Sequence, residues 1–60
     1  MLHENNIVTA QNDLSEKVLR GSIGVIVMVY QDPSLAYEVE FFDKNGETIE
    51  LLTVYENDIL

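Results

Sequence analysis

Side chains that could act as nucleophiles, bases or metal ligands are few in this chain. It has one histidine, His3, and no cysteine, which excludes a thiolate nucleophile and a cysteine-type zinc site. His3 would need fixed partners to act as a base or a ligand, and it lies beside Glu4 in an N-terminal segment that we expect to be solvated. No serine has a histidine near it in sequence to activate it. We therefore expect no enzyme and no catalytic residue.

Three carboxylates, those of Glu38, Glu40 and Glu50, are the remaining candidates for a chemical site. Calcium takes six to eight oxygen ligands, usually from a loop, and three carboxylates on a flat sheet supply too few. Paired carboxylates for hydrolysis need a cleft, which so short a chain hardly offers. Gly21 and Gly24 do not match the spacing of phosphate-binding loops. We expect no metal and no cofactor.

The charge balance limits the possible partners. Eleven acidic residues face three basic ones (Lys17, Arg20 and Lys44), for a formal net charge of -8. Nucleic-acid binding depends on lysine and arginine at phosphates, and anionic membranes also attract basic segments, so neither partner is expected. A basic protein surface is compatible with this charge. The alternative explanation is that the acidity serves solubility alone.

The elements that would position these side chains are predominantly strands. Apolar runs and alternation predict strands over 7–9, 22–31, 36–43 and 47–53, a 3₁₀ turn over 55–58 and a final strand over 59–60. Residues 13–20 are expected to form a loop, and residues 1–6 to be frayed. Sixty residues, 47% of them hydrophobic, fit one ordered domain spanning 1–60. No apolar run is long enough to cross a bilayer and no secretory signal is recognised, so we expect a cytoplasmic protein.

The pair Asn45-Gly46 predicts a hairpin between the third and fourth strands. A three-residue loop over 44–46, with Gly46 left-handed, keeps the apolar residues of both strands on one face. It places Phe41 opposite Ile49 and Val39 opposite Leu51. A one-residue slip would turn a whole face to solvent.

This register also predicts an acidic surface. Glu40 would lie opposite Glu50, with Glu38 nearby, and like charges opposed on a sheet destabilise it by up to about 1 kcal/mol. A basic partner docking there would explain that cost. Phe42 falls on the same face and is predicted to be an exposed contact, whereas Tyr37 and Phe41 are expected in the core.

The second strand is apolar on both faces, which is unusual in an isolated antiparallel sheet. Strand alternation divides its apolar side chains into two sets, of which one is Ile23, Val25, Val27 and Val29 and the other is Ile26, Met28 and Tyr30. A strongly bent barrel strand could contribute to the core from both sides across a bulge. The loop over 13–19 could instead cover its outer face, or that face could be an exposed interface around Met28.

The chain resembles a bacterial family known as domain of unknown function 4926, and more generally the SH3-like barrels. The resemblance covers residues 7–60. It rests on the segments 13–14, 19–26, 29–30, 36–41, 43, 46–48 and 51–53, which include the glycine-led run Arg20-Gly21-Ser22-Ile23-Gly24-Val25 and the block Ala36-Tyr37-Glu38-Val39-Glu40-Phe41. It implies an all-β fold, a small five-stranded SH3-like barrel with a short 3₁₀ turn before the last strand. It implies no activity.

These observations favour a protein-interaction module, for example an antitoxin or immunity-type partner of a basic protein. The residues predicted to bind protein are Glu38, Glu40, Phe42, Glu50 and Met28. One alternative is a homo-oligomer built through the apolar outer face of the second strand. A weaker one is a nucleic-acid-binding domain related to the KOW motif, using Lys17, Arg20 and Lys44.

Overall fold

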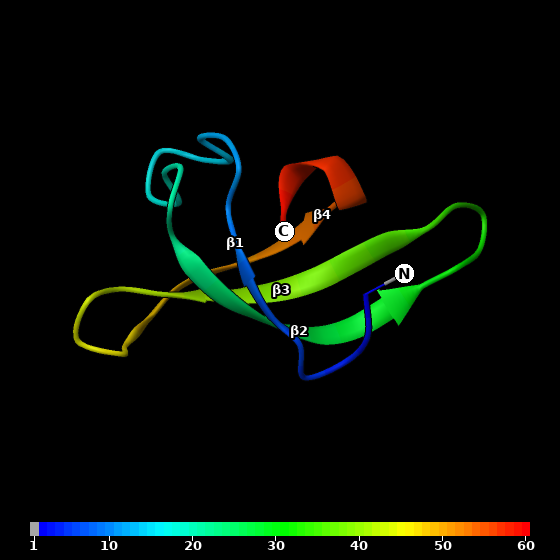
Figure 1. Ribbon diagram of the computed structural model, residues 1–60, viewed down its shortest axis with the longest axis horizontal. Coiled ribbons are helices and arrows are strands. Elements are labelled where there is room, and N and C mark those ends of the chain that lie inside the picture. The colour runs from blue at the N-terminus through cyan, green and yellow to red at the C-terminus, as the bar shows by residue number, and fades with distance from the viewer. Residues whose placement is uncertain (1) are drawn as a thin grey trace.

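Four strands in chain order form one antiparallel sheet in residues 2–60, the part of the chain described by the computed structural model (Figure 1). They are β1 (Ile7–Thr9), β2 (Ile23–Tyr30), β3 (Ala36–Phe42) and β4 (Thr48–Val54), and a 3₁₀ turn, η1 (Glu56–Asp58), follows. The all-β prediction, the four strands, the long loop after β1 and the 3₁₀ turn are confirmed. No helix within these residues has the length and apolarity needed to cross a membrane.

The predicted fifth strand and the closed barrel are wrong. Beyond η1, the chain makes one isolated bridge, between Ala10 and Ile59. Thr9 N donates to Leu60 O at 2.9 Å and Leu60 N donates to Thr9 O at 3.1 Å. The segment after η1 is too short to pair along both β1 and β4, so the sheet stays open between these two strands.

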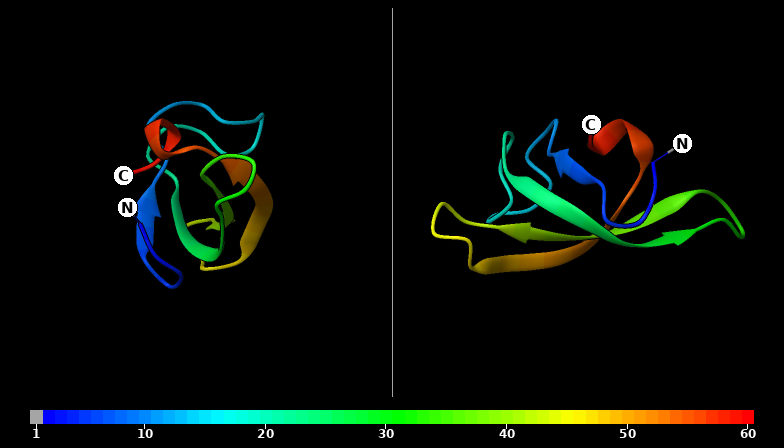
Figure 2. Two further views of the ribbon diagram at one scale, coloured as in Figure 1. Left: turned by 90° about the vertical axis from the view of Figure 1, so that its right-hand side faces the viewer. Right: turned by 60° about the horizontal axis from the view of Figure 1, so that its bottom comes forward.

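The core lies on one face of the sheet, which we call the inner face. The loop over 10–22 and the C-terminal turn both lie above this face (Figure 1), and the end-on view in Figure 2 shows the sheet curling around it. Val18, at the end of the loop, and Ile59, after η1, are buried there. The buried cluster consists of Val8, Ala10, Val18, Ile26, Tyr37, Val39, Phe41, Val54 and Ile59. Tyr37 and Phe41 are therefore core residues, as predicted.

A bulge explains why β2 is apolar on both faces. The pairing of β2 with β3 shifts between Ile26, opposite Val39, and Met28, opposite Glu38. Before the shift Ile26 faces the core, and after it Val29 packs against the core. The bulge reverses which alternate residues point inward. The bulge of the first explanation is therefore present, but in an open sheet and not in a barrel.

The loop over 13–19 does not cover the outer side of β2. Val18 and Leu14 pack into the inner-face core instead, while Val27 and Met28 remain exposed. The second explanation is therefore wrong, and the outer side of β2 is open to solvent in residues 2–60.

The hairpin between β3 and β4 has the predicted loop but not the predicted register. Asp43 N donates to Glu47 O at 2.8 Å, Gly46 N donates to Asp43 O at 3.0 Å, and Gly46 has a φ of 81°. This is the three-residue turn with a left-handed glycine. The loop over 44–46 is confirmed.

Beyond the turn, a second bulge shifts the strands by one residue. Phe42 pairs with Thr48, but Phe41 pairs with Glu50, so Ile49 is the extra residue. Further along, Glu40 lies opposite Leu51, and the predicted opposition of Glu40 and Glu50 is wrong. The inner-face partners from β4 are Leu52 and Val54, which lie opposite Val39 and Tyr37.

Candidate functional site

The side of the sheet that points away from the core, which we call the outer face, holds four of the five predicted binding residues. Residues directly opposite each other in an antiparallel ladder share a face. Met28 pairs with Glu38, and Val25 pairs with Glu40. Phe42 follows two residues after Glu40 on β3, so it points the same way. The regular alternation of β3 thus places Glu38, Glu40 and Phe42 in one line.

The surroundings of the two glutamates on the outer face are largely apolar. The row through Glu40 contains Ile7, Val25 and Leu51, one from each of the other strands. Ile7 is 72% exposed, Leu51 53% and Met28 47%. Large apolar side chains that remain together in solvent are typical of interaction surfaces.

Threonine hydroxyls from β4 hold both carboxylates. Thr48 Oγ1 donates to Glu40 Oε2 and Thr53 Oγ1 donates to Glu38 Oε1, each at 2.5 Å. Neither glutamate accepts a hydrogen bond from a lysine or arginine side chain within residues 2–60. Both carboxylates are therefore drawn toward β4, and neither forms an ion pair with a side chain of residues 2–60.

Glu50 does not belong to this surface. Its partner Phe41 is a core residue, so Glu50 lies on the inner side of the sheet, at its rim. There Ser15 Oγ donates to Glu50 Oε1 at 2.6 Å. The sequence-based grouping of Glu50 with Glu38 and Glu40 is wrong because the bulge at Ile49 shifts the alternation of β4 by one residue. Glu50 therefore points to the inner side. Glu50 anchors the long loop instead.

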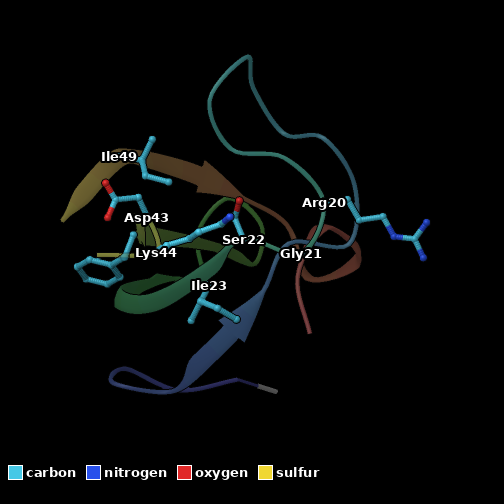
Figure 3. Close-up of a pocket in the computed structure, with 8 residues that line it drawn as sticks. Arg20, Gly21, Ser22, Ile23, Asp43, Lys44 and Ile49 are labelled. Carbon is cyan, nitrogen blue, oxygen red and sulfur yellow. The ribbon is translucent and has the colours of Figure 1, made fainter. Parts of the chain in front are cut away.

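Phe42 is half-buried rather than fully exposed. It helps to line a shallow pocket of about 360 Å³ at the hairpin end of the sheet. Figure 3 shows Lys44 extended toward Ser22 in this pocket, whereas the Arg20 side chain points away from it. The lining residues are Arg20, Gly21, Ser22, Ile23, Phe42, Asp43, Lys44 and Ile49.

His3 is the other side chain that the sequence offers as a base or metal ligand. His3 is exposed, and its backbone N donates to Asn6 Oδ1 at 2.9 Å. No three histidine, cysteine, aspartate or glutamate side chains in this part of the chain come together in a way that could hold a metal ion.

Several outer-face residues were missed by sequence reasoning. Ile7, Leu51, Thr48 and Thr53 surround the two glutamates, and only Leu51 was considered, as a core residue. The position of Thr48 carries a usable signal, since a hairpin turning at 44–46 places it opposite Phe42, on the face of Glu40. Thr53 reaches the face of Glu38 only because of the bulge at Ile49. The bulge that brings Leu51 outward has no such local signal.

The fold and this surface define a small all-β protein with an open antiparallel sheet and an acidic, partly apolar outer face. The chain belongs to the family described as domain of unknown function (DUF4926), whose family model matches residues 4–60. This confirms the resemblance to that family. No curated protein matched the chain, and no solved structure matched it.

Proposed function

We propose that this protein is a protein-interaction module that binds a basic protein through the outer face of its sheet. The observation that carries the proposal is the placement of Glu38 and Glu40, which form no ion pair within the described part of the chain, among exposed apolar side chains. Carboxylates beside apolar contacts suit a partner surface that combines lysine or arginine with apolar residues. Neutralising a basic protein, as an antitoxin or immunity protein does, is the kind of role this surface fits.

The net charge of -8 supports the same proposal. Opposite net charges speed the encounter of two proteins, and this effect weakens as salt increases. Solubility would explain acidic residues scattered anywhere on the surface. It does not explain why Glu40 lies in a row with Ile7, Val25 and Leu51, or why Glu38 lies beside the exposed Met28.

The experiment is a double charge reversal, Glu38→Lys with Glu40→Lys. Proteins that copurify with the chain from its own cells are identified by mass spectrometry, and the affinity of the purified partner is then measured for each variant. The control is Glu16→Lys with Glu56→Lys, which makes the same change in net charge at exposed sites off the outer face. Thermal unfolding of each variant verifies that it folds.

We expect the outer-face variant to bind the partner at least tenfold more weakly. The control variant should lose only the part of the affinity that depends on net charge. Exposed ion pairs contribute about 0.2–1 kcal/mol each, and reversal adds repulsion to that loss. Equal binding by the outer-face variant and the control, or a partner that is itself acidic, would overturn the proposal.

A second candidate is a homo-oligomer that buries the outer side of β2. Its specific support is that three large apolar side chains of this strand, Ile23, Val27 and Met28, are exposed. Sedimentation at micromolar concentration distinguishes the two candidates. A homo-oligomer that dissociates on Met28→Lys would favour this one, and a monomer would count against it.

We also propose that the fold is an open relative of the SH3-like barrels. The order of elements supports this: a long loop after β1, a 3₁₀ turn after β4, and a last segment that reaches Ala10. A solved structure of any family member with a complete fifth strand would test the relationship.

A further inference from the structure

The two outer strands of the sheet differ in how their free edges are covered. The edge of β1 is partly closed, because Thr9 exchanges hydrogen bonds with Leu60, and Gln11 N donates to Asp58 O at 2.8 Å. Strand β4 is paired with β3 on one side only. Apart from the ladder with β3, no backbone hydrogen bond joins Thr48–Val54 to another segment within residues 2–60. Figures 1 and 2 show β4 at the outside of the sheet, with no other strand beside its free edge.

The pairing pattern shows which backbone groups point to this free edge. Asp43 N donates to Glu47 O, and hydrogen-bonded pairs alternate with non-hydrogen-bonded pairs along an antiparallel ladder. Counting along β3 from Asp43, Glu40 and Glu38 belong to non-hydrogen-bonded pairs with β4. Their partners Leu51 and Thr53 therefore direct their N–H and C=O groups outward, away from β3.

This edge carries few of the features that normally protect a free strand. Natural edges are blocked by lysine, proline, inward-pointing charges or bulges. β4 contains no lysine and no proline. Its bulge and its one charge, Glu50, lie toward the hairpin, so the run from Leu51 to Val54 is regular. Leu51, in the middle of the strand, is more than half exposed.

The charges beside this edge indicate what would pair with it. The threonine hydroxyls of β4 draw the carboxylates of Glu38 and Glu40 toward the open side. A strand added to β4 would lie two strand spacings from β3, about 10 Å. Lysine and arginine side chains on that strand, extended across β4, are long enough to meet these carboxylates, and their stems would cover Leu51.

We propose that β4 is the docking edge for an extended basic segment of the partner, which adds a fifth strand to the sheet. This inference rests on the proposed function and specifies its binding mode. Residues of the segment opposite Leu51 and Thr53 face the outer side and are lysine or arginine. The residue between them faces the inner side beside Leu52 and is apolar. Backbone hydrogen bonds supply the pairing, and the alternation of basic and apolar residues supplies selectivity.

The test uses a defined probe, a seven-residue peptide of alternating lysine and valine with acetylated and amidated ends. Its counterpart has every backbone amide N-methylated, which keeps the charge and side chains but prevents strand pairing. Binding to the full chain is followed by NMR titration, together with amide hydrogen exchange at Leu51 and Thr53. We expect the methylated peptide to bind at least tenfold more weakly, and exchange at both amides to slow at least tenfold with the unmethylated one.

Two variants of Leu51 test the edge from the side of the protein. Leu51→Pro removes an outward N–H, a position where an edge strand tolerates proline, and should abolish peptide binding. Leu51→Thr is the matched control, since it removes the leucine side chain but keeps the N–H, and should retain binding. If Leu51→Pro fails to fold, the comparison of the two peptides on the unchanged protein still decides.

The outcomes separate this inference from the proposed function. In one outcome, both peptides bind equally well, and the double variant Glu38→Gln with Glu40→Gln binds both of them more weakly. This result would overturn the edge proposal and leave outer-face binding in place. No detectable binding of either peptide would also overturn it, while the purified partner still tests the proposed function. A dimer whose Leu51 and Thr53 amides are protected without peptide would show that a second copy occupies the edge, which contradicts a basic partner strand.

Discussion

Gly24 shows how closely the inner side of β2 approaches the core. A Cβ atom at this position would lie 2.6 Å from Val39 Cγ1 and 2.8 Å from Phe41 Cδ1. Both of these neighbours are fully buried and cannot move aside without disturbing others, because protein interiors are closely packed. Glycine is required here by space and not by an unusual backbone angle.

We predict that Gly24→Ala destabilises the fold by about 1–3 kcal/mol, the usual cost of overpacking a core. Chemical denaturation measures the loss. Combining Gly24→Ala with Val39→Ala should recover part of it, since the closest contact is then removed. A Gly24→Ala protein as stable as the original would contradict the close approach.

The loop after β1 is an element fixed at a few points. Ser15 Oγ donates to Glu50 on β4 and accepts from Val18 N at 3.0 Å. Asp13 Oδ1 accepts from Arg20 N at 2.8 Å, which closes the other end. These contacts hold Val18 in the core, and so the loop supplies part of the inner layer that a helix or second sheet supplies in larger proteins.

We predict that Ser15→Ala lowers stability by about 1–2 kcal/mol, because it removes the loop's hydrogen bonds to Glu50 and to Val18 N. Amide exchange of Val18 should quicken more than exchange in β3. Ser15→Thr retains the hydroxyl and serves as the control. Uniform acceleration across the whole sheet would mean that the loop unfolds only together with it.

The hairpin between β3 and β4 shows where prediction from sequence succeeds and where it stops. The turn depends on neighbouring residues, Asn45 and Gly46, whose backbone preferences are local, and it was predicted. The bulge at Ile49 depends on the packing of β4 against the core, and no short-range sequence pattern predicts it. Glu50 was consequently placed on the wrong face. Met28, by contrast, was rightly suspected of facing solvent on the outer side.

At the scale of the whole molecule, the unbalanced charge acts on every part of a chain with a Cα radius of gyration of 10.5 Å. Eleven acidic residues and three basic ones are held within a few Debye lengths of one another. Their mutual repulsion opposes the compact state.

We predict that the melting temperature rises as sodium chloride increases from about 0.01 to 0.2 M, where screening grows most steeply. The gain should be smaller in a variant with Glu16→Lys and Glu56→Lys, whose net charge is closer to zero. Differential scanning calorimetry gives both values. A melting temperature that falls with salt over this range would contradict net repulsion.

The bulge in β2 has a consequence for how this protein tolerates change over generations. Before the bulge the even-numbered residues of β2, such as Ile26, face the core, and after it the odd-numbered ones, such as Val29, do so. We expect polar substitutions to be tolerated poorly at these inward positions. A library of single substitutions should therefore show a tolerance pattern that changes phase at Val27. Deletion of Val27, the extra residue, would restore a regular ladder and leave Ile26 and Val29 facing the interior. A regular ladder with Val27 retained would instead turn Val29 to the surface.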